Sequence, residues 1–363
     1  MKKTDLCIIG GFLGAGKTTS ILSIAKRLAD SGKKVGIVTN DQGSELVDTN
    51  FLIKSGLQVL EVTGGCFCCN FDEFTDKVNK LSETLKPDIV LAEPVGSCTD
   101  LIATIFKPIQ ADFVKNFVMS PLSVIADPKR IKKLMMGKDS LFPSEINYLF
   151  KKQLEEADII VLNKIDLLTR DEISEIKKFL KHEFKGTEVI AASAKYGTGI
   201  DDWVSLITGR IAPKKESLKI DYETYAAAES FLGWFNSTAV ISSDSPLDMN
   251  KLMDHLIGCI KEKLLNAKCE IAHLKIYAIS GDDFAKASLT GLYDDTDFNK
   301  KMESAASSAN IIINARVSAS PEILKPIILE SLKSTAAIFG TALSDIEIQC
   351  FKPSRPKPKY RMQ

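Results

Sequence analysis

The sequence has no excess of charge, no long apolar run and few cysteines. Its 47 Lys and Arg balance 47 Asp and Glu, so no global basic field marks nucleic acid as a partner. No stretch approaches the ~20 apolar residues that span a bilayer. Lys17 interrupts the apolar run near the start, and no A-x-A-like cleavage site follows it. Eight cysteines in 363 residues are too few for a disulfide scaffold. The sequence therefore predicts a cytoplasmic protein of about two domains, with no nucleic-acid or membrane partner.

Short apolar runs alternate with amphipathic segments through the first two hundred residues. This alternation is typical of a sheet with crossover helices. Because the runs lack polar alternation, they predict strands buried on both faces and hence a mostly parallel sheet. The predicted strands are 5–9, 35–39, 57–62, 88–92, 122–126, 158–162 and 188–191. We expect an α/β domain over residues 1–212.

The remainder of the chain has a different order of elements. A Pro213-Lys214-Lys215-Glu216 segment marks the exit from the first domain, and we expect a linker over 213–228. The pattern that follows is β-α-β-β-α-β, which predicts a smaller ferredoxin-like α+β domain over 229–352. Its predicted elements are strand 231–242, helix 249–265, strands 269–279 and 311–317, helix 322–337 and strand 346–351. Residues 353–363 are basic and contain proline, so we expect an extended tail.

A glycine-rich motif follows the first strand and precedes a helical stretch. The segment G-F-L-G-A-G-K-T at 11–18 matches G-x-x-x-x-G-K-[ST]. Such a loop turns backbone N–H groups toward phosphates, while Lys17 reaches the β/γ oxygens and Thr18 offers its hydroxyl to Mg²⁺. The alternative is a glycine-rich turn with a chance lysine, which the flanking strand and helix disfavour. The expected nucleotide contacts here are Gly11, Gly14, Ala15, Gly16, Lys17, Thr18 and Thr19.

A second motif, N-K-I-D at 163–166, follows the strand 159–162. An aspartate at position 166 accepts both N1–H and the 2-amino group of guanine, which adenine does not offer. A common surface turn is the alternative interpretation. Ser193-Ala194-Lys195, after the next strand, resembles the loop that contributes to the guanine site in GTPases. The sequence thus predicts GTP as the nucleotide, contacted by Asn163, Lys164, Asp166, Ser193, Ala194 and Lys195.

Two acidic segments are candidates for the magnesium site. Glu93, at the end of strand 88–92, is expected to hold Mg²⁺ or a metal-bound water, and the Gly96 amide to sense the γ-phosphate. Asp41, in Asn40-Asp41-Gln42-Gly43, is the second candidate, although a plain turn role also fits. The predicted catalytic residues are Lys17, Thr18, Asp41 and Glu93, and which acid is the main one stays open.

Three of the eight cysteines crowd into the segment G-G-C-F-C-C at 64–69, before a predicted helix. A helix N-terminus lowers the pKa of a thiol and favours the thiolate that binds metal. Cys66, Cys68 and Cys69 are able to coordinate one thiophilic ion, such as Zn²⁺, Co²⁺, Ni²⁺ or Cu⁺. The absence of a fourth sulfur is expected to leave a position open for an exchangeable ligand. The alternatives are small buried residues and a reversible disulfide.

In this order, the motifs G-G-F-L-G-A-G-K-T-T, G-G-C-F-C-C, E-P-V-G and N-K-I-D resemble those of the CobW family of metallochaperone GTPases, relatives of UreG and HypB. The resemblance covers residues 1–212. It implies a Mg²⁺-dependent GTPase that binds a transition metal, Zn²⁺ or Co²⁺, at Cys66, Cys68 and Cys69. It further implies delivery of that metal to a client metalloprotein, or cofactor assembly in it, and dimerisation or client docking through this domain. Cys350-Phe351-Lys352-Pro353 resembles a subgroup associated with corrinoid methyltransferases, which adds a corrinoid protein as a client.

The chain departs from the family pattern in two places. Many members have N-E-F-G where this chain has Asn40-Asp41-Gln42-Gly43. Many also carry histidine-rich tracts, whereas this chain has three histidines, which argues against auxiliary metal storage. Two rival functions stay open. One is a P-loop kinase, against which Asn163 and Asp166 argue, and the other is a GTP-driven regulatory switch whose cysteines hold a structural zinc or are redox-active.

Overall fold

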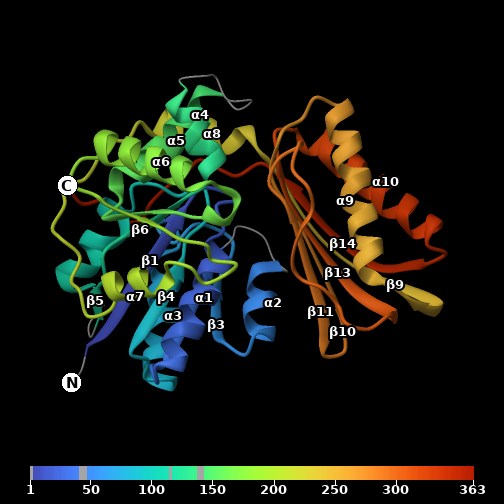
Figure 1. Cartoon of the computed structure of the whole chain (residues 1–363), viewed down its shortest axis with the longest axis horizontal. Helices are drawn as coiled ribbons and strands as arrows, with labels where there is room; N and C mark the ends of the chain where they lie inside the picture. The colour runs from blue at the N-terminus through green and yellow to red at the C-terminus, as the bar shows by residue number, and fades with distance from the viewer. Residues whose placement is uncertain (1–2, 41–46, 114–116, 137–142) are drawn as a thin grey trace. The chain divides into compact units, whose positions relative to one another are not determined.

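The computed structural model describes residues 3–40, 47–113, 117–136 and 143–363 (Figure 1). The chain forms two compact units. The first comprises Met1–Gln42, Leu52–Ala226 and Pro356–Gln363, and the second comprises Gly43–Phe51 and Ala227–Arg355. The division at Ala226 falls inside helix α8 (Tyr222–Phe231), which occupies part of the segment expected as a linker. In the part of the chain that the structure describes, no helix has the length and apolar character needed to cross a membrane.

The first unit is built on a parallel sheet with the order β3-β2-β4-β1-β6-β7-β8, and β5 also pairs with β1. The seven predicted strands are confirmed. The inner strands β1, β2, β4, β6 and β7 are buried almost throughout, whereas the edge strands β3 and β8 are partly exposed. The three-residue strand β5 was not predicted. The strands are β1 (Thr4–Gly11), β2 (Val35–Asn40), β3 (Gln58–Val62), β4 (Ile89–Glu93), β5 (Phe117–Met119), β6 (Ser123–Ala126), β7 (Ile159–Leu162) and β8 (Glu188–Ala191).

Helices pack around this sheet (Figure 1). Helix α1 buries Ile21, Ile24 and Leu28 in the same core as Cys7 and Ile37 of the strands. The helices of this unit are α1 (Lys17–Asp30), α3 (Phe71–Thr84), α4 (Pro128–Met135), α5 (Ser144–Glu156), α6 (Arg170–Glu183) and α7 (Ile200–Ile207), with shorter helical turns at Ile102–Phe106, Ile109–Phe113 and Ile165–Leu167. Helix α2 (Val47–Lys54) is divided between the two units after Phe51. Since all the strands are parallel, the loops that follow them lie at one edge of the sheet. The P-loop, the C-x-C-C motif and the N-K-I-D motif follow β1, β3 and β7, and so lie at this edge.

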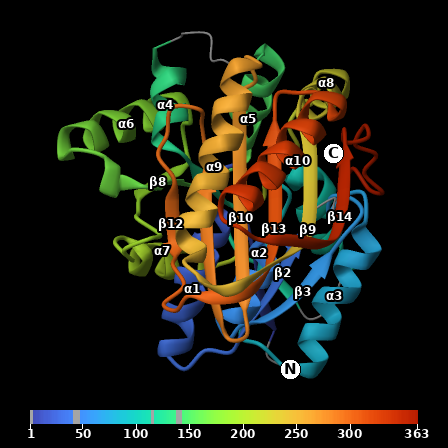
Figure 2. The same cartoon turned by 90° about the vertical axis from the view of Figure 1, so that its right-hand side faces the viewer.

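The second unit has an antiparallel sheet with the order β12-β11-β10-β13-β9-β14. Helices α9 and α10 lie across one face of it (Figure 2). Strands β10, β13, β9 and β14 with these helices form the predicted β-α-β-β-α-β arrangement, and β11 and β12 extend the sheet beyond β10. The elements are β9 (Gly233–Leu247), α9 (Met249–Asn266), β10 (Ile271–Ser280), β11 (Asp283–Leu289), β12 (Asp297–Lys300), β13 (Ala306–Val317), α10 (Pro321–Ile338) and β14 (Ala342–Phe351).

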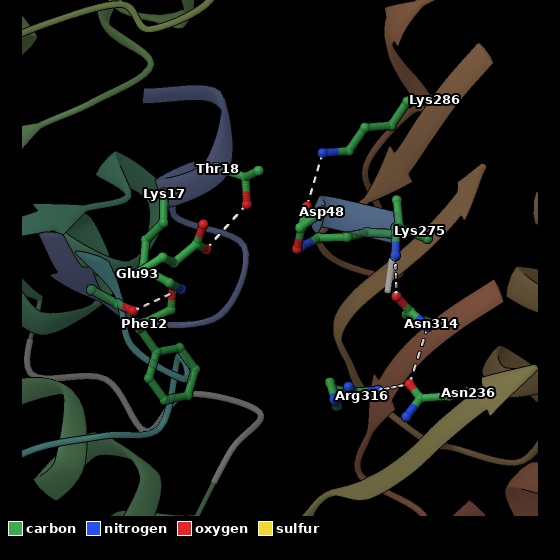
Figure 3. Close-up of polar contacts among 12 residues, drawn as sticks. Phe12, Lys17, Thr18, Asp48, Glu93, Asn236, Lys275, Lys286, Asn314 and Arg316 are labelled. Atoms are coloured by element: carbon green, nitrogen blue, oxygen red, sulfur yellow. Dashed lines mark hydrogen bonds and ion pairs between the residues drawn. The ribbon is translucent and has the colours of Figure 1, made fainter. Parts of the chain in front are cut away.

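The start of helix α2 is bonded to the sheet within the second unit. Lys286 Nζ donates to Asp48 Oδ1 at 2.9 Å, and Lys275 also binds this carboxylate (Figure 3). The Val47 amide donates to Asn314 Oδ1 at 3.0 Å. Burial opposes ionisation of Asp48, but the two ammonium groups outweigh it and hold the pKa of Asp48 well below its usual value. The carboxylate therefore fixes the first turn of α2 on strands β10 and β11.

Candidate nucleotide and metal sites

The loop after β1 requires glycine at specific positions. Gly11, Gly14 and Gly16 have φ angles of 136°, 77° and 96°, which side chains rarely adopt. A β-carbon at position 11 would lie 2.6 Å from the Ile125 carbonyl oxygen, and one at position 16 would lie 2.5 Å from Asn163 Nδ2. The loop thus adopts a glycine-dependent wrapped conformation directly before the N-terminus of α1, where backbone N–H groups favour phosphate.

Charged and hydroxyl groups follow this loop. Lys17 Nζ donates to the carbonyl oxygens of Gly11 and Phe12 at 3.0 and 3.4 Å, and Lys17 is only 8% exposed. Thr18 Oγ1 donates to Glu93 Oε1 at 3.1 Å (Figure 3). A hydroxyl and a carboxylate side by side are oxygen ligands of the kind that Mg²⁺ prefers. These residues therefore fit a magnesium nucleotide, and the contact with Thr18 places the predicted acid Glu93 beside the loop.

The segment after β4 also reaches the P-loop. A β-carbon on Gly96 would lie 2.6 Å from Leu13 Cδ2 and 3.0 Å from Lys17 Nζ. Gln153 of α5 donates from Nε2 to the carbonyl oxygens of Gly96 and Cys98, at 3.0 and 2.9 Å. The segment is therefore packed against the lysine that is expected to bind phosphate, and α5 holds it there.

The residues predicted for the base lie together. Asn163 Nδ2 donates to the Ala15 carbonyl oxygen at 2.9 Å, and its Oδ1 accepts from the Ala194 amide at 3.0 Å. Ser193 Oγ donates to Asp166 Oδ1 at 2.5 Å. Asn163 thus connects the P-loop to the loop after β8, and the Asp166 carboxylate is held by that same loop.

Lys164 makes a second connection that the sequence did not indicate. Its Nζ donates to the Gly14 carbonyl oxygen and to Asp127 Oδ2, both at 2.8 Å. Burial of Asp127 opposes ionisation, but the Lys164 ammonium outweighs it and lowers the pKa of this carboxyl. Asp127 caps the N-terminus of α4. In the sequence, the sign of this cap is an aspartate that follows a predicted strand and precedes a proline.

Lys195, the last residue predicted to contact the base, has its Nζ 5.9 Å from the Tyr196 ring centroid.

Asn40, at the end of β2, holds the cysteine loop. Its Nδ2 donates to the carbonyl oxygens of Val62 and Gly65 at 3.0 and 2.7 Å, and its Oδ1 accepts from the Phe67 amide at 2.9 Å. For the segment Asn40-Asp41-Gln42-Gly43, the sequence predicts a role in magnesium binding for Asp41, which lies outside the described residues. The role of Asn40 was missed, because its partners follow a different strand.

The three cysteines of the motif form a compact sulfur cluster. Cys66 Sγ lies 3.0 Å from the sulfurs of both Cys68 and Cys69, and all three sulfurs lie within 4.8 Å of one another. The loop closes through the Asn70 amide, which donates to the Cys66 carbonyl at 2.8 Å. Hydrogen bonds within the cluster lower the pKa of Cys66 well below its usual value and raise that of Cys69 to about 11. The cluster suits a thiophilic metal ion.

A fourth thiol touches this cluster. The Cys98 side chain is hydrogen-bonded to Cys66, and only 2% of Cys98 is exposed. Cys98 comes from the loop after β4 rather than from the C-x-C-C motif, and its sulfur is not in the group of three that lie within 4.8 Å of one another.

The last residues of the chain pack along the cysteine loop. The Lys357 amide donates to Cys69 Sγ at 3.3 Å, and the Lys359 amide donates to the Cys68 carbonyl oxygen at 2.8 Å. The Lys359 ammonium forms an ion pair with Asp72 at the start of α3. The expected extended tail has no helix or strand, and its part Pro356–Gln363 belongs to the first unit. It contributes an N–H bond to one of the candidate metal ligands.

The tail also reaches the segment that follows Cys98. Arg361 Nε and the Tyr222 hydroxyl donate to Asp100 Oδ2 at 2.7 and 2.8 Å. Glu156 of α5 accepts from the Leu101 amide at 2.8 Å and also binds the Asp100 amide. Burial and the Asp100 carboxylate raise the pKa of Glu156 to about 8. A charged, buried network therefore fixes the backbone next to Cys98.

Comparison with known proteins identifies the family. The sequence profile described as "CobW/HypB/UreG, nucleotide-binding domain" matches residues 5–191. The chain belongs to this family. Zinc chaperone CobW of Sinorhizobium sp is 32% identical over 289 residues, which are 72% of this chain and 78% of that protein. Zinc chaperone YeiR of Escherichia coli (strain K12) is 34% identical over 172 residues, 47% of this chain and 48% of that protein. The crystal structure of Zn(II)-bound YjiA GTPase from E. coli aligns with 94% of this chain and 99% of that one, at 14% identity and a TM-score of 0.38.

This CobW/HypB/UreG protein is a P-loop GTPase with a cysteine cluster suited to a transition metal. The P-loop, the C-x-C-C cluster, Glu93 and the N-K-I-D motif all lie within the matched residues, whereas the tail lies outside them. The matched residues thus include the candidate site except the loop Ser193-Ala194-Lys195 and the tail.

Proposed function

We propose that this GTPase binds a thiophilic divalent metal at Cys66, Cys68 and Cys69 and delivers it to a client metalloprotein in a cycle driven by GTP hydrolysis. The main observation behind this proposal is that the three sulfurs lie within 4.8 Å of one another. The cluster follows β3, and the P-loop follows β1 of the same parallel sheet. Relatives named as zinc chaperones support zinc as the metal. Cobalt is the second candidate, with a corrinoid protein as its client, because thiolates bind both ions.

The nucleotide-binding residues have separable roles in this proposal. The P-loop amides and Lys17 bind the β- and γ-phosphates, and Asp166 accepts hydrogen bonds from guanine. Thr18 and Glu93 hold Mg²⁺, which when bound neutralises phosphate charge, and Asp41 is retained as a second acid. The Gly96 amide, beside Lys17, donates toward the γ-phosphate. GTP and GDP then differ in the contacts that they make with the segment after β4.

Cobalt titration of the purified, reduced protein tests the proposal. Co²⁺ is added in the presence of Mg²⁺ with either GDP or a non-hydrolysable GTP analogue. We expect a thiolate-to-cobalt charge-transfer band whose affinity differs between the two nucleotides. The triple variant C66S/C68S/C69S should lose the band, and the matched variant Cys259→Ser, in the second unit, should keep it. An unchanged titration in the triple variant would overturn the proposed metal site.

The same preparation distinguishes delivery from a regulatory switch with a structural zinc. Zinc-loaded protein is mixed with a chromophoric chelator, and the release rate is followed with each nucleotide. A metal that is cargo leaves faster in one nucleotide state, whereas a structural metal leaves slowly in both. Equal, slow release with GDP and with the analogue would favour the switch and contradict delivery.

A further inference from the structure

One short backbone segment contacts both the P-loop and the cysteine cluster. At Gly96, a β-carbon would lie 3.0 Å from Lys17 Nζ. Two residues later, the buried Cys98 thiol is hydrogen-bonded to Cys66. The turn between them is closed by the Cys98 amide, which donates to the Val95 carbonyl oxygen at 2.9 Å. A displacement at the nucleotide end of this segment therefore has a direct backbone route to a thiol at the metal end.

Helix α5 holds this segment from both sides of Cys98. The Gln153 side chain donates to the carbonyl oxygens of Gly96 and Cys98 at 3.0 and 2.9 Å. Glu156 accepts from the Thr99 hydroxyl at 3.0 Å and from the Leu101 amide at 2.8 Å. These contacts fix the position of the Cys98 backbone, so the thiol has little freedom to leave the cluster unless the segment moves as a whole.

The chemistry of a zinc site favours a fourth sulfur here. Zinc in closed sites takes four ligands at a Zn–S distance of ~2.3 Å, which places the sulfurs about 3.8 Å apart. The sulfurs of Cys68 and Cys69 each lie 3.0 Å from Cys66 Sγ, which is shorter than this spacing. Metal binding therefore has to move the sulfurs apart. Cys98 contacts Cys66 but is not in the group of three sulfurs mutually within 4.8 Å. Four-sulfur coordination thus requires the Cys98 sulfur to move closer to the other three sulfurs.

We propose that Cys98 is the fourth thiolate ligand of the bound metal, and that its bond to the metal forms or breaks with the nucleotide state. This inference rests on the proposed metal-binding function. Binding of Cys98 releases the thiol proton to water and closes the coordination sphere. In the reverse step, a donor atom of the client forms a bond to the metal as the Cys98–metal bond breaks, and the departing thiolate takes a proton from water. Three thiolates remain, with one position open to the client.

X-ray absorption spectroscopy of the zinc-loaded wild-type chain tests this directly, because it counts sulfur ligands without any substitution. Samples contain Mg²⁺ with GDP or with the GTP analogue. We expect four sulfurs in one state and three sulfurs with one oxygen or nitrogen in the other. Three sulfurs in both states would overturn the assignment of Cys98, and four in both would overturn its exchange with nucleotide.

A cobalt titration of Cys98→Ser provides the second test, with Cys259→Ser as the matched thiol control. We expect the charge-transfer absorbance per cobalt to fall by about a quarter in the four-sulfur state, because one of four thiolates is lost. Metal affinity should weaken by at least about tenfold, and its dependence on nucleotide should shrink. If Cys98→Ser titrates like wild type while C66S/C68S/C69S loses the band, only the Cys98 inference fails. If the triple variant titrates like wild type, the proposed function itself fails.

Discussion

Replacing Asn40 with alanine removes three hydrogen bonds that position the cysteine loop. The bonds to Val62, Gly65 and Phe67 have lengths of 3.0, 2.7 and 2.9 Å, and the Asn40 side chain is largely buried. At about 0.5–1.5 kcal/mol for each bond, the loss is about 1.5–4.5 kcal/mol. This cost falls on the loop that precedes Cys66. Because such supporting contacts typically change metal affinity by roughly 10–100-fold, we expect zinc binding to weaken by that factor.

The assay is competition for Zn²⁺ with a chromophoric chelator, under reducing conditions and without nucleotide. Asn70→Ala is the matched control, since the Asn70 side chain makes one bond to the same loop, from Nδ2 to the Thr63 carbonyl oxygen at 3.0 Å, and the substitution keeps the bond from the Asn70 amide to Cys66. That bond is exposed, so its loss should change the affinity by less than about fivefold. Binding of a fluorescent GDP derivative serves as a folding control for both variants.

Two results would refute the reasoning. Wild-type zinc affinity in a folded Asn40→Ala variant would mean that the side chain does not hold the metal loop in place. Equal losses in Asn40→Ala and Asn70→Ala would mean that the number of hydrogen bonds does not set the effect.

Three further substitutions have defined outcomes. Asp166→Asn should weaken GTP binding by about two orders of magnitude or more and improve xanthosine triphosphate binding, measured by competition, because the amide donates where guanine needs an acceptor. Asp48→Asn removes the carboxylate that the Lys275 and Lys286 ammonium groups both bind, so hydrogen exchange along β10 and β11 should show a loss of about 2–3 kcal/mol, unchanged from pH 8 to pH 5 because the pKa of Asp48 is lowered. Arg361→Gln should lower the melting temperature more at pH 8 than at pH 5: burial raises the pKa of Asp100, and protonation at low pH removes the charge that the arginine compensates. An equal shift at both pH values would contradict this.

Most of the fold could be predicted from local patterns in the sequence. The strands of the first unit were predicted because a parallel strand covered on both faces is apolar throughout. In the second unit, β11 was missed because it reads D-F-A-K-A-S-L, with a lysine in its middle. That lysine, Lys286, is only 2% exposed because it is bonded to Asp48, a residue far away in the sequence. The four residues of β12 are mostly polar and lie at the edge of the sheet.

The candidate site also contains residues that could be predicted from the sequence and residues that could not. The P-loop, the N-K-I-D motif and C-x-C-C are each complete within a few residues, so their spacing is visible in the sequence. Asn40, Cys98 and Lys357 were missed because each acts on a loop that is distant along the chain. No spacing rule connects them to the cysteines. The sheet order does so for the first two, because Asn40 ends β2 and Cys98 follows β4, the neighbour of β2.

That sheet order explains how one edge of the sheet holds both the P-loop and the cysteine cluster. In the order β3-β2-β4-β1, the loop after β3 carries the cysteine cluster and the loop after β1 carries the P-loop. Strand β4 lies between β1 and β2, and its loop contributes Glu93 beside Thr18 and Cys98 beside Cys66. Any change in phosphate contacts that moves the loop after β4 also moves a thiol at the metal cluster. The proposed coupling between GTP and metal therefore needs no motion of one compact unit against the other. It should survive substitutions at Asp48 that loosen the first turn of α2 from strands β10 and β11.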